Sequence, residues 1–153
     1  MDVQSLQFYA AMGWPLFPCS NKSKKPLTSH GFKDATTDVG QLKAWHGQHV
    51  GCAWGCATSS ERGVIDIDPR HGGDVTLASL EAQHGPLPLT PRVRTGGGGT
   101  HFYFRFPAGT GCAIDLFPGI DRRAEGGYVI IPPSKIDIPE HEGRTYAWDV
   151  KPW

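Results

Sequence analysis

The run Val64-Ile65-Asp66-Ile67-Asp68 alternates apolar and acidic residues, and it constrains the fold more than any other segment of the chain. Successive side chains of a β-strand point to opposite faces, so the run predicts a strand whose isoleucines face a core while Asp66 and Asp68 share the other face. Crowded carboxylates repel each other, and their oxygens suit divalent cations. The pattern therefore indicates a metal site, unless the acids only mark the place where a buried strand returns to water.

Frequent glycine and proline predict an α+β domain of short elements. The 153 residues include 20 glycines and 13 prolines, which separate the apolar runs by turns. Helices are expected to begin at the caps Asp2, Asp38 and Asp74, and the third to end at Gly85. Early helices and many strands predict a mixed or antiparallel sheet with helices over one face. The expected strands are residues 14–18, 50–57, 63–68, 92–95, 101–106, 120–121, 128–131 and 145–149.

The overall composition narrows the possible partners and locations. Fifteen basic and fifteen acidic residues give a formal net charge of zero, so a nucleic acid would have to be held by a local basic patch. Apolar runs fall short of the ~20 residues of a membrane span, and the N-terminus lacks the basic start of a signal peptide. We expect residues 1–153 to form a single cytoplasmic domain without a membrane partner, cut from a longer polypeptide.

Four consecutive glycines precede a strand that begins with a histidine. Glycines 96–99 allow backbone N–H groups to approach an anion closely, as phosphate-binding loops require, although a hairpin turn is the alternative. His101 could donate a hydrogen bond to a phosphate oxygen. Alternation along residues 101–106 predicts that the phenylalanines face the core. The residues between them are then available to a site: His101, Tyr103 and Arg105.

A third acid follows another short apolar run. Asp121 comes after Ile120 and could complete a three-carboxylate cluster with Asp66 and Asp68. Three acids would suit two metals about 3.5–4 Å apart, an arrangement that aligns an attacking hydroxyl with a nucleoside triphosphate. The two arginines that follow Asp121 are either phosphate ligands or ordinary surface charges.

Two further segments could contact phosphates. Lys22, Lys24 and Lys25 form a basic loop, in which Lys25 is the first candidate for a phosphate ligand and a solvated loop is the alternative. Ser134 either faces a nucleotide or caps a turn. Contacts of this kind would make nucleic-acid binding fall with increasing salt concentration.

Four segments, in order, resemble the bifunctional DNA primase/polymerase (prim-pol) N-terminal domain of plasmid, phage and bacterial replication proteins, within the archaeo-eukaryotic primase superfamily. They are GWPLFPCSNKSKKPLTSHGFKDATTD, VIDID, TGGGGTHFYF and GIDRRAEGGYVIIPPS, and together they span nearly the whole chain. The resemblance implies a primase catalytic core with an RNA-recognition-like mixed or antiparallel sheet flanked by helices.

The resemblance also implies an activity and roles for particular residues. It implies a nucleotidyltransferase, a DNA-directed primase or polymerase, that uses Mg²⁺ or Mn²⁺ without an organic cofactor. Asp66, Asp68 and Asp121 would hold the metal, and a single-stranded DNA template, dNTPs or NTPs and a helicase domain in the same polypeptide would be partners. Some relatives carry serine at position 99, so the N–H groups of Gly98 and Gly99 are expected to replace its hydroxyl. The expected nucleotide-binding residues are His101, Thr100, Gly98, Gly99, Arg94, Lys25, Arg122 and Ser134.

Three other function classes remain open at this point. A non-catalytic nucleotide- or DNA-binding module with a degenerate primase site would bind nucleotide without turnover. A replication-origin nicking enzyme would use a His-hydrophobic-His metal pair and a catalytic tyrosine, but His101-Phe102-Tyr103 supplies only the first histidine of that pair. A glycosyltransferase could use the Asp-x-Asp motif with Mn²⁺, but it would not explain the glycine–histidine strand or Asp121.

Overall fold

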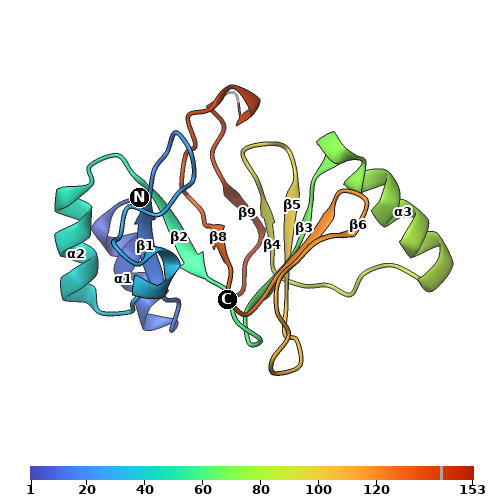
Figure 1. Ribbon diagram of the computed structural model, residues 1–153, viewed down its shortest axis with the longest axis horizontal. Coiled ribbons are helices and arrows are strands. Elements are labelled where there is room, and N and C mark those ends of the chain that lie inside the picture. Colours follow the sequence, from blue (N-terminus) through green and yellow to red (C-terminus); the bar gives the residue numbers. More distant parts are fainter. Residues whose placement is uncertain (142) are drawn as a thin grey trace. The chain divides into compact units, whose positions relative to one another are not determined.

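The computed structural model describes residues 1–141 and 143–153, and these residues divide into two compact units (Figure 1). The first unit comprises Met1–Ala57 and Tyr128–Ala147, and the second comprises Thr58–Gly127 and Trp148–Trp153. Helices and antiparallel sheets together confirm the predicted α+β class. The strands form two sheets, however, where the sequence pattern predicted one.

The first unit packs two helices beside a small antiparallel sheet (Figure 1). The helices are α1 (Val3–Ala11) and α2 (Val39–Gln48). The sheet has the order β1-β2-β8, with β1 at Leu16–Cys19, β2 at Ala53–Ala57 and β8 at Tyr128–Ile130. Strand β1 contains Pro18 and lies at the edge of the sheet, which suits proline because it cannot donate a ladder hydrogen bond. Short 3₁₀ helices, η1 (Gly31–Asp34) and η3 (Pro139–His141), complete the unit.

Local capping signals position both helices of this unit as predicted. The Asp2 carboxylate accepts the Ser5 N–H at 2.8 Å, and the Asp38 carboxylate accepts the Gln41 N–H at 2.6 Å. Such caps satisfy N–H groups that a helix start leaves without an intrahelical partner. Leu42 of α2 is buried in the core. Strand β2 starts three residues later than expected, and Val50 lies outside it with 88% of its surface exposed.

The second unit carries a larger antiparallel sheet, with β3 in its interior. Its order is β6-β7-β3-β5-β4-β9. The acidic run therefore forms a strand flanked on both sides, as the alternation indicated. The bounds are β3 Gly63–Ile67, β4 Arg92–Arg94, β5 Thr100–Phe104, β6 Ala113–Phe117, β7 Ile120–Arg123 and β9 Ala147–Val150.

Helix α3 (Gly73–His84) follows β3 through the 3₁₀ helix η2 (Pro69–His71) and begins earlier than predicted. Its N-cap is Gly72 at φ +78°, and Asp74, the expected cap, lies in its first turn. Position 73 requires glycine because of a close backbone approach, since a Cβ there would lie 2.2 Å from the Gly119 carbonyl oxygen. The helix ends where expected, with Gly85 as its C-cap.

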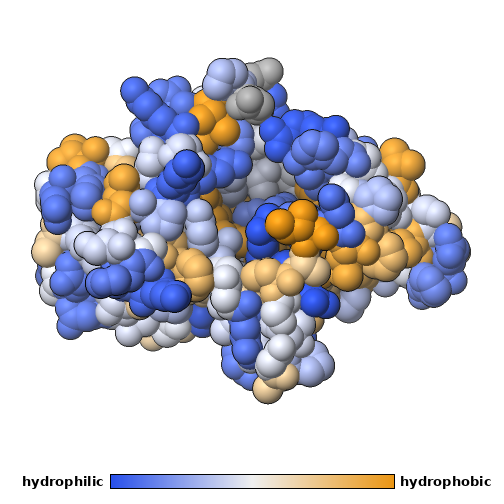
Figure 2. Space-filling model, viewed as in Figure 1, coloured by the Kyte–Doolittle hydropathy of each residue, from blue (hydrophilic) through white to orange (hydrophobic). Residues whose placement is uncertain are grey.

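The edge strand β6 was not predicted from the sequence. Its pairing with β7 shifts register between Ala113 and Phe117, and Asp115 adopts φ +49°. Ile114 is 74% exposed, so the run lacks the alternating burial that identifies a strand. Figure 2 shows apolar surface over this β6–β7 hairpin.

Within the described residues, none of the helices combines the length and apolar character that crossing a membrane requires.

Candidate active site

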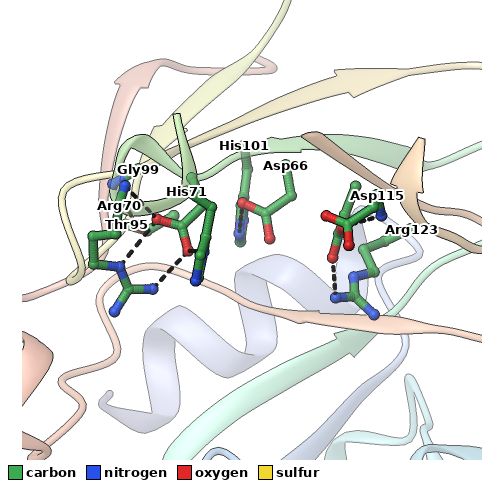
Figure 3. Close-up of polar contacts among 10 residues, drawn as sticks. Asp66, Arg70, His71, Thr95, Gly99, His101, Asp115 and Arg123 are labelled. Atoms are coloured by element: carbon green, nitrogen blue, oxygen red, sulfur yellow. Dashed lines mark hydrogen bonds and ion pairs between the residues drawn. The ribbon is translucent and has the colours of Figure 1, made fainter. Parts of the chain in front are cut away.

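Three side chains from separate sequence motifs lie in one row across the sheet of the second unit (Figure 3). Asp66 on β3 is directly opposite Asp121 on β7 and directly opposite His101 on β5. Directly paired residues of antiparallel strands project to the same face, with Cβ atoms about 4.5–5.5 Å apart. The register thus assembles two carboxylates and an imidazole that are up to 55 positions apart in the sequence.

His101 closes one end of this row. Its Nε2 lies 3.6 Å from Asp66 Oδ1, and 5% of the His101 side chain is exposed, compared with 28% of the Asp66 side chain. At this separation the two groups form an ion pair when the imidazole is protonated. The pair provides a site where negative charge and a potential proton donor lie side by side.

The expected burial of the two faces of β5 was wrong. His101 and Tyr103 are 4% and 6% exposed, whereas the phenylalanines are half-buried. Tyr103 packs against Trp148 of β9, with ring centroids 5.4 Å apart, and His101 pairs with the buried Val93. Alternation places side chains on opposite faces, but tertiary packing decides which face is covered more completely. Arg105 lies beyond the strand and is largely exposed.

Asp121 is oriented by two contacts at the other end of the row. Its Oδ1 accepts the Asp115 backbone N–H at 2.8 Å, and its Oδ2 accepts the Arg123 guanidinium at 2.6 Å. The residue that donates this N–H, Asp115, has a left-handed backbone conformation and lies in the irregular part of β6. A non-glycine residue at positive φ is uncommon and often marks a functional constraint.

Arg123, which was not among the expected nucleotide-binding residues, contacts Asp121 in the structure. Along β7, Asp121 and Arg123 are two residues apart and therefore share a face, while Arg122 points to the other. Arg122 pairs with Ile65 and donates its Nε–H to the Gly111 carbonyl at 2.9 Å. The alternation that linked Asp66 to Asp68 would have identified Arg123 in the same way.

Asp68 is turned toward its own sequence neighbours. It is the N-cap of η2 and accepts the Arg70 backbone N–H at 3.0 Å. The Arg70 side chain adds contacts of 3.0 Å to Oδ1 and 2.8 Å to Oδ2, and His71 Nδ1 lies 3.1 Å from Oδ2. The Arg70 guanidinium hydrogen bonds lower the pKa of the Asp68 carboxyl to about 2. Arg70 and His71 were not among the expected site residues.

The expected three-carboxylate cluster is therefore not assembled. Among residues 1–141 and 143–153, no three histidine, cysteine or acidic side chains are grouped to hold a metal ion. Asp66 and Asp121 nevertheless occupy adjacent strands of one face, and both side chains are partly exposed. Mg²⁺ is commonly held by one or two carboxylates together with water and substrate phosphates, so this pair fits such an ion.

The glycine run forms the hairpin turn between β4 and β5, and two of its predicted phosphate donors are already engaged. Gly98 donates its N–H to the Thr95 carbonyl at 3.1 Å, and Gly99 donates its N–H to Thr95 Oγ1 at 3.0 Å. A Cβ on Gly99 would lie 2.4 Å from the Ile67 carbonyl oxygen, so glycine is required there for close packing against β3. The expectation that these two N–H groups are free to bind phosphate is thus not met in this conformation.

The remaining candidates lie elsewhere. Arg94 and Thr100 pair with each other on the face of the sheet opposite His101, because each is one residue away from the Val93–His101 pair. Lys25 and Ser134 belong to the first unit. Lys25 is exposed there, and Ser134 is buried, with its hydroxyl accepting the Trp54 N–H at 2.9 Å.

Comparison with known proteins identifies a family. A family model described as "Bifunctional DNA primase/polymerase, N-terminal" matches residues 6–152, nearly the whole chain. No curated protein matches the chain.

Proposed function

This chain belongs to the Prim-Pol family of bifunctional DNA primase/polymerase N-terminal domains, and we propose that it catalyses template-directed nucleotidyl transfer. Its family membership implies a domain of the primase/polymerase type. The finer proposal is synthesis or extension of a primer on single-stranded DNA from dNTPs or NTPs, with Mg²⁺ or Mn²⁺ as the cation. Plasmid or phage replication, with a helicase in the same polypeptide, is the proposed setting.

The observation that carries this proposal is the row of Asp121, Asp66 and His101 across β7, β3 and β5. Two carboxylates directly opposite each other on neighbouring strands are mutually destabilising, and a cation between them removes that cost. An imidazole at the end of the row suits an anionic group that is bound beside the cation. The acid pair and the imidazole together are suited to binding a nucleoside triphosphate with its divalent ion.

Each residue of the row has a proposed task. Asp66 and Asp121 would hold the cation, which when bound supplies charge neutralisation and alignment for the reacting phosphate. His101 would donate a hydrogen bond to the triphosphate from its position beside Asp66. Arg123 and the Asp115 N–H keep the Asp121 carboxylate oriented. No nucleophilic side chain is required, because the substrate brings its own hydroxyl and catalysis consists of positioning and charge stabilisation.

The test is incorporation of labelled nucleotides on a single-stranded template, with and without primer, in Mg²⁺ and in Mn²⁺. The wild-type chain is expected to form product, and Asp66→Asn is expected to abolish it while leaving the circular dichroism spectrum unchanged. Asp74→Asn, an exposed acid on α3, is the matched control and should retain full incorporation. Undiminished synthesis by Asp66→Asn would rule out the proposed site.

One observation favours a second candidate, a nucleotide- or DNA-binding module without turnover. Both oxygens of Asp68 are engaged by Arg70, and such a site would lack its third carboxylate. This alternative predicts that the wild-type chain binds nucleotide in Mn²⁺ yet forms no product with or without primer. The same incorporation assay, paired with a nucleotide-binding titration, separates the two functions.

A further inference from the structure

The Asp68 carboxylate already accepts three N–H groups of Arg70 on its two oxygens. An ionised carboxylate offers roughly four lone-pair sites on its two oxygens. Oδ1 accepts the backbone N–H and the Nε–H of Arg70, and Oδ2 accepts the Arg70 terminal N–H and faces His71 Nδ1. A metal that uses Asp68 must therefore compete with these contacts, two of which come from the Arg70 side chain.

The backbone that carries Arg70 is fixed, whereas its side chain is not buried. The Asp68 N–H donates to the Gly119 carbonyl, and the Gly73 N–H donates to the Asp68 carbonyl, so both ends of the η2 turn are held. The Arg70 side chain itself is 43% exposed. Partly exposed ion pairs contribute little net stability, so the guanidinium can exchange partners without unfolding the turn.

We propose that Arg70 is a positioning residue with two alternating partners, the Asp68 carboxylate in the metal-free protein and the triphosphate of the nucleotide in the loaded one. The inference rests on the proposed function, since it requires the cation proposed for Asp66 and Asp121 to engage Asp68 as well. A nucleotide whose phosphates share that cation lies next to the carboxylate that Arg70 now holds. The planar guanidinium matches carboxylate and phosphate equally well, because both accept two parallel N–H groups.

This exchange makes opposite predictions for the two ligands. Arg70 competes with the cation for Asp68, so removing its charge should strengthen binding of the cation alone. It also supplies a phosphate contact, so the same change should weaken binding of the nucleotide. A merely structural Arg70 would weaken both or affect neither.

The first measurement is a titration of the metal-free 153-residue chain with Mn²⁺ alone, followed by the electron paramagnetic resonance signal of free Mn²⁺. Arg70→Gln is expected to bind Mn²⁺ about fivefold more tightly, equivalent to about 1 kcal/mol. Arg105→Gln is the matched control, since it removes the same charge from an exposed arginine paired with Glu61 in the same unit. Its Mn²⁺ affinity should stay within about twofold of wild type. If Mn²⁺ affinity rises equally in both variants, or does not rise in Arg70→Gln, Arg70 does not compete with the cation for Asp68.

The second measurement is calorimetric binding of a non-hydrolysable dGTP analogue, α,β-imido dGTP, at saturating Mn²⁺. Arg70→Gln should bind it about tenfold more weakly than wild type, and Arg70→Lys should fall between them because it keeps the charge but loses the planar fork. If Arg70→Gln binds the nucleotide as tightly as wild type, Arg70 does not move from Asp68 to the triphosphate.

The failure of this inference is distinguishable from failure of the proposed function. If the wild-type chain binds Mn²⁺ and nucleotide and forms product, while Arg70→Gln matches it in both titrations, the role of Arg70 is wrong and the proposed function stands. If the wild-type chain binds no Mn²⁺, both proposals fail together. Thermal unfolding of Arg70→Gln and Arg70→Lys verifies that the variants are folded.

Discussion

Asp68 and Asp121 are each followed two positions later by an arginine, and the two arginines behave differently. On β7, Arg123 contacts Asp121 through one terminal nitrogen at 2.6 Å. After β3, Arg70 covers both oxygens of Asp68 with its Nε and terminal nitrogen. The same Asp-x-Arg spacing thus produces a single contact in one region and a bidentate contact in the other.

The difference lies in the backbone between the two residues. Residues two apart on a strand are separated by about 6.6–6.8 Å along its axis, so a side chain reaches its neighbour only with its tip. Asp68 instead begins a 3₁₀ turn, which folds Arg70 back over the carboxylate. The strand thus gives Asp121 one arginine contact and the turn gives Asp68 two, although the two acid side chains are similarly exposed, at 21% and 26%.

Removing the carboxylate on the strand should have the largest effect. Asp121→Asn is expected to lower nucleotide incorporation by at least about 100-fold, because even residues that support metal ligands are commonly worth 10–100-fold. Asp115→Asn is the control, since Asp115 contributes its backbone N–H and asparagine tolerates positive φ. Steady-state incorporation measures both variants. Asp121→Asn with more than a tenth of wild-type activity would contradict a role for this acid in the site.

The turn that carries Arg70 should be sensitive to packing at Gly73. Gly73→Ala would bring a Cβ within 2.2 Å of the Gly119 carbonyl and is expected to lower the free energy of unfolding by about 2–3 kcal/mol. Gly47→Ala in α2 meets nothing within 4 Å and should raise that free energy by about 0.5–1 kcal/mol. Urea unfolding measures both. Equal stabilities of the two variants would mean that the close approach does not hold the turn.

The Asp68 carboxyl should titrate unusually low, and its pKa should depend on Arg70. Its pKa is about 2 in the folded chain, compared with an ordinary value of 3.8. The folded state therefore binds fewer protons than the unfolded state in this window, and the stability from Asp68 is present above about pH 4 and lost as the pH falls through 2. Arg70→Gln should return the pKa toward 3.8 and flatten this loss. Carboxyl ¹³C NMR titration and unfolding midpoints from about pH 2 to 5 test it, and an unchanged pKa in the variant would contradict the assigned cause.

The smallest effect is expected at the strand arginine. Arg123→Gln should alter Mn²⁺ affinity by less than about twofold, because Arg123 contacts a single oxygen of Asp121 through one nitrogen. The Mn²⁺ titration described for Arg70 measures it directly. A fivefold increase in Mn²⁺ affinity, equal to that expected for Arg70→Gln, would show that the strand arginine and the turn arginine affect the cation alike.

Sequence reasoning identified the elements whose signals are local. The caps Asp2 and Asp38, the stop at Gly85 and the strand of Val64 to Ile67 were all predicted, since each depends on residues within a few positions. It missed β6, whose strand conformation depends on pairing with β7 across a register shift.

The candidate site divides in the same way. The chemical types and their order along the chain pointed to Asp66, Asp121 and His101, and the family match agrees with the resemblance on which their roles rest. The sequence was less informative about which of several adjacent residues faces the site. Arg122 was preferred to Arg123, and the N–H groups of Gly98 and Gly99 were expected to be available although Thr95 engages them.

By itself, the sequence determined the α+β class and the acidic strand, and it pointed to the residues proposed to bind a cation and phosphate, because alternation, capping and turn preferences act between near neighbours. Only the tertiary structure decided that Asp121, Asp66 and His101 form one row and that Arg70 occupies Asp68. Strand register follows from hydrogen bonds between distant segments, and a side chain's partner depends on how the backbone turns after the strand ends. Neither is encoded in the spacing of residues along the chain.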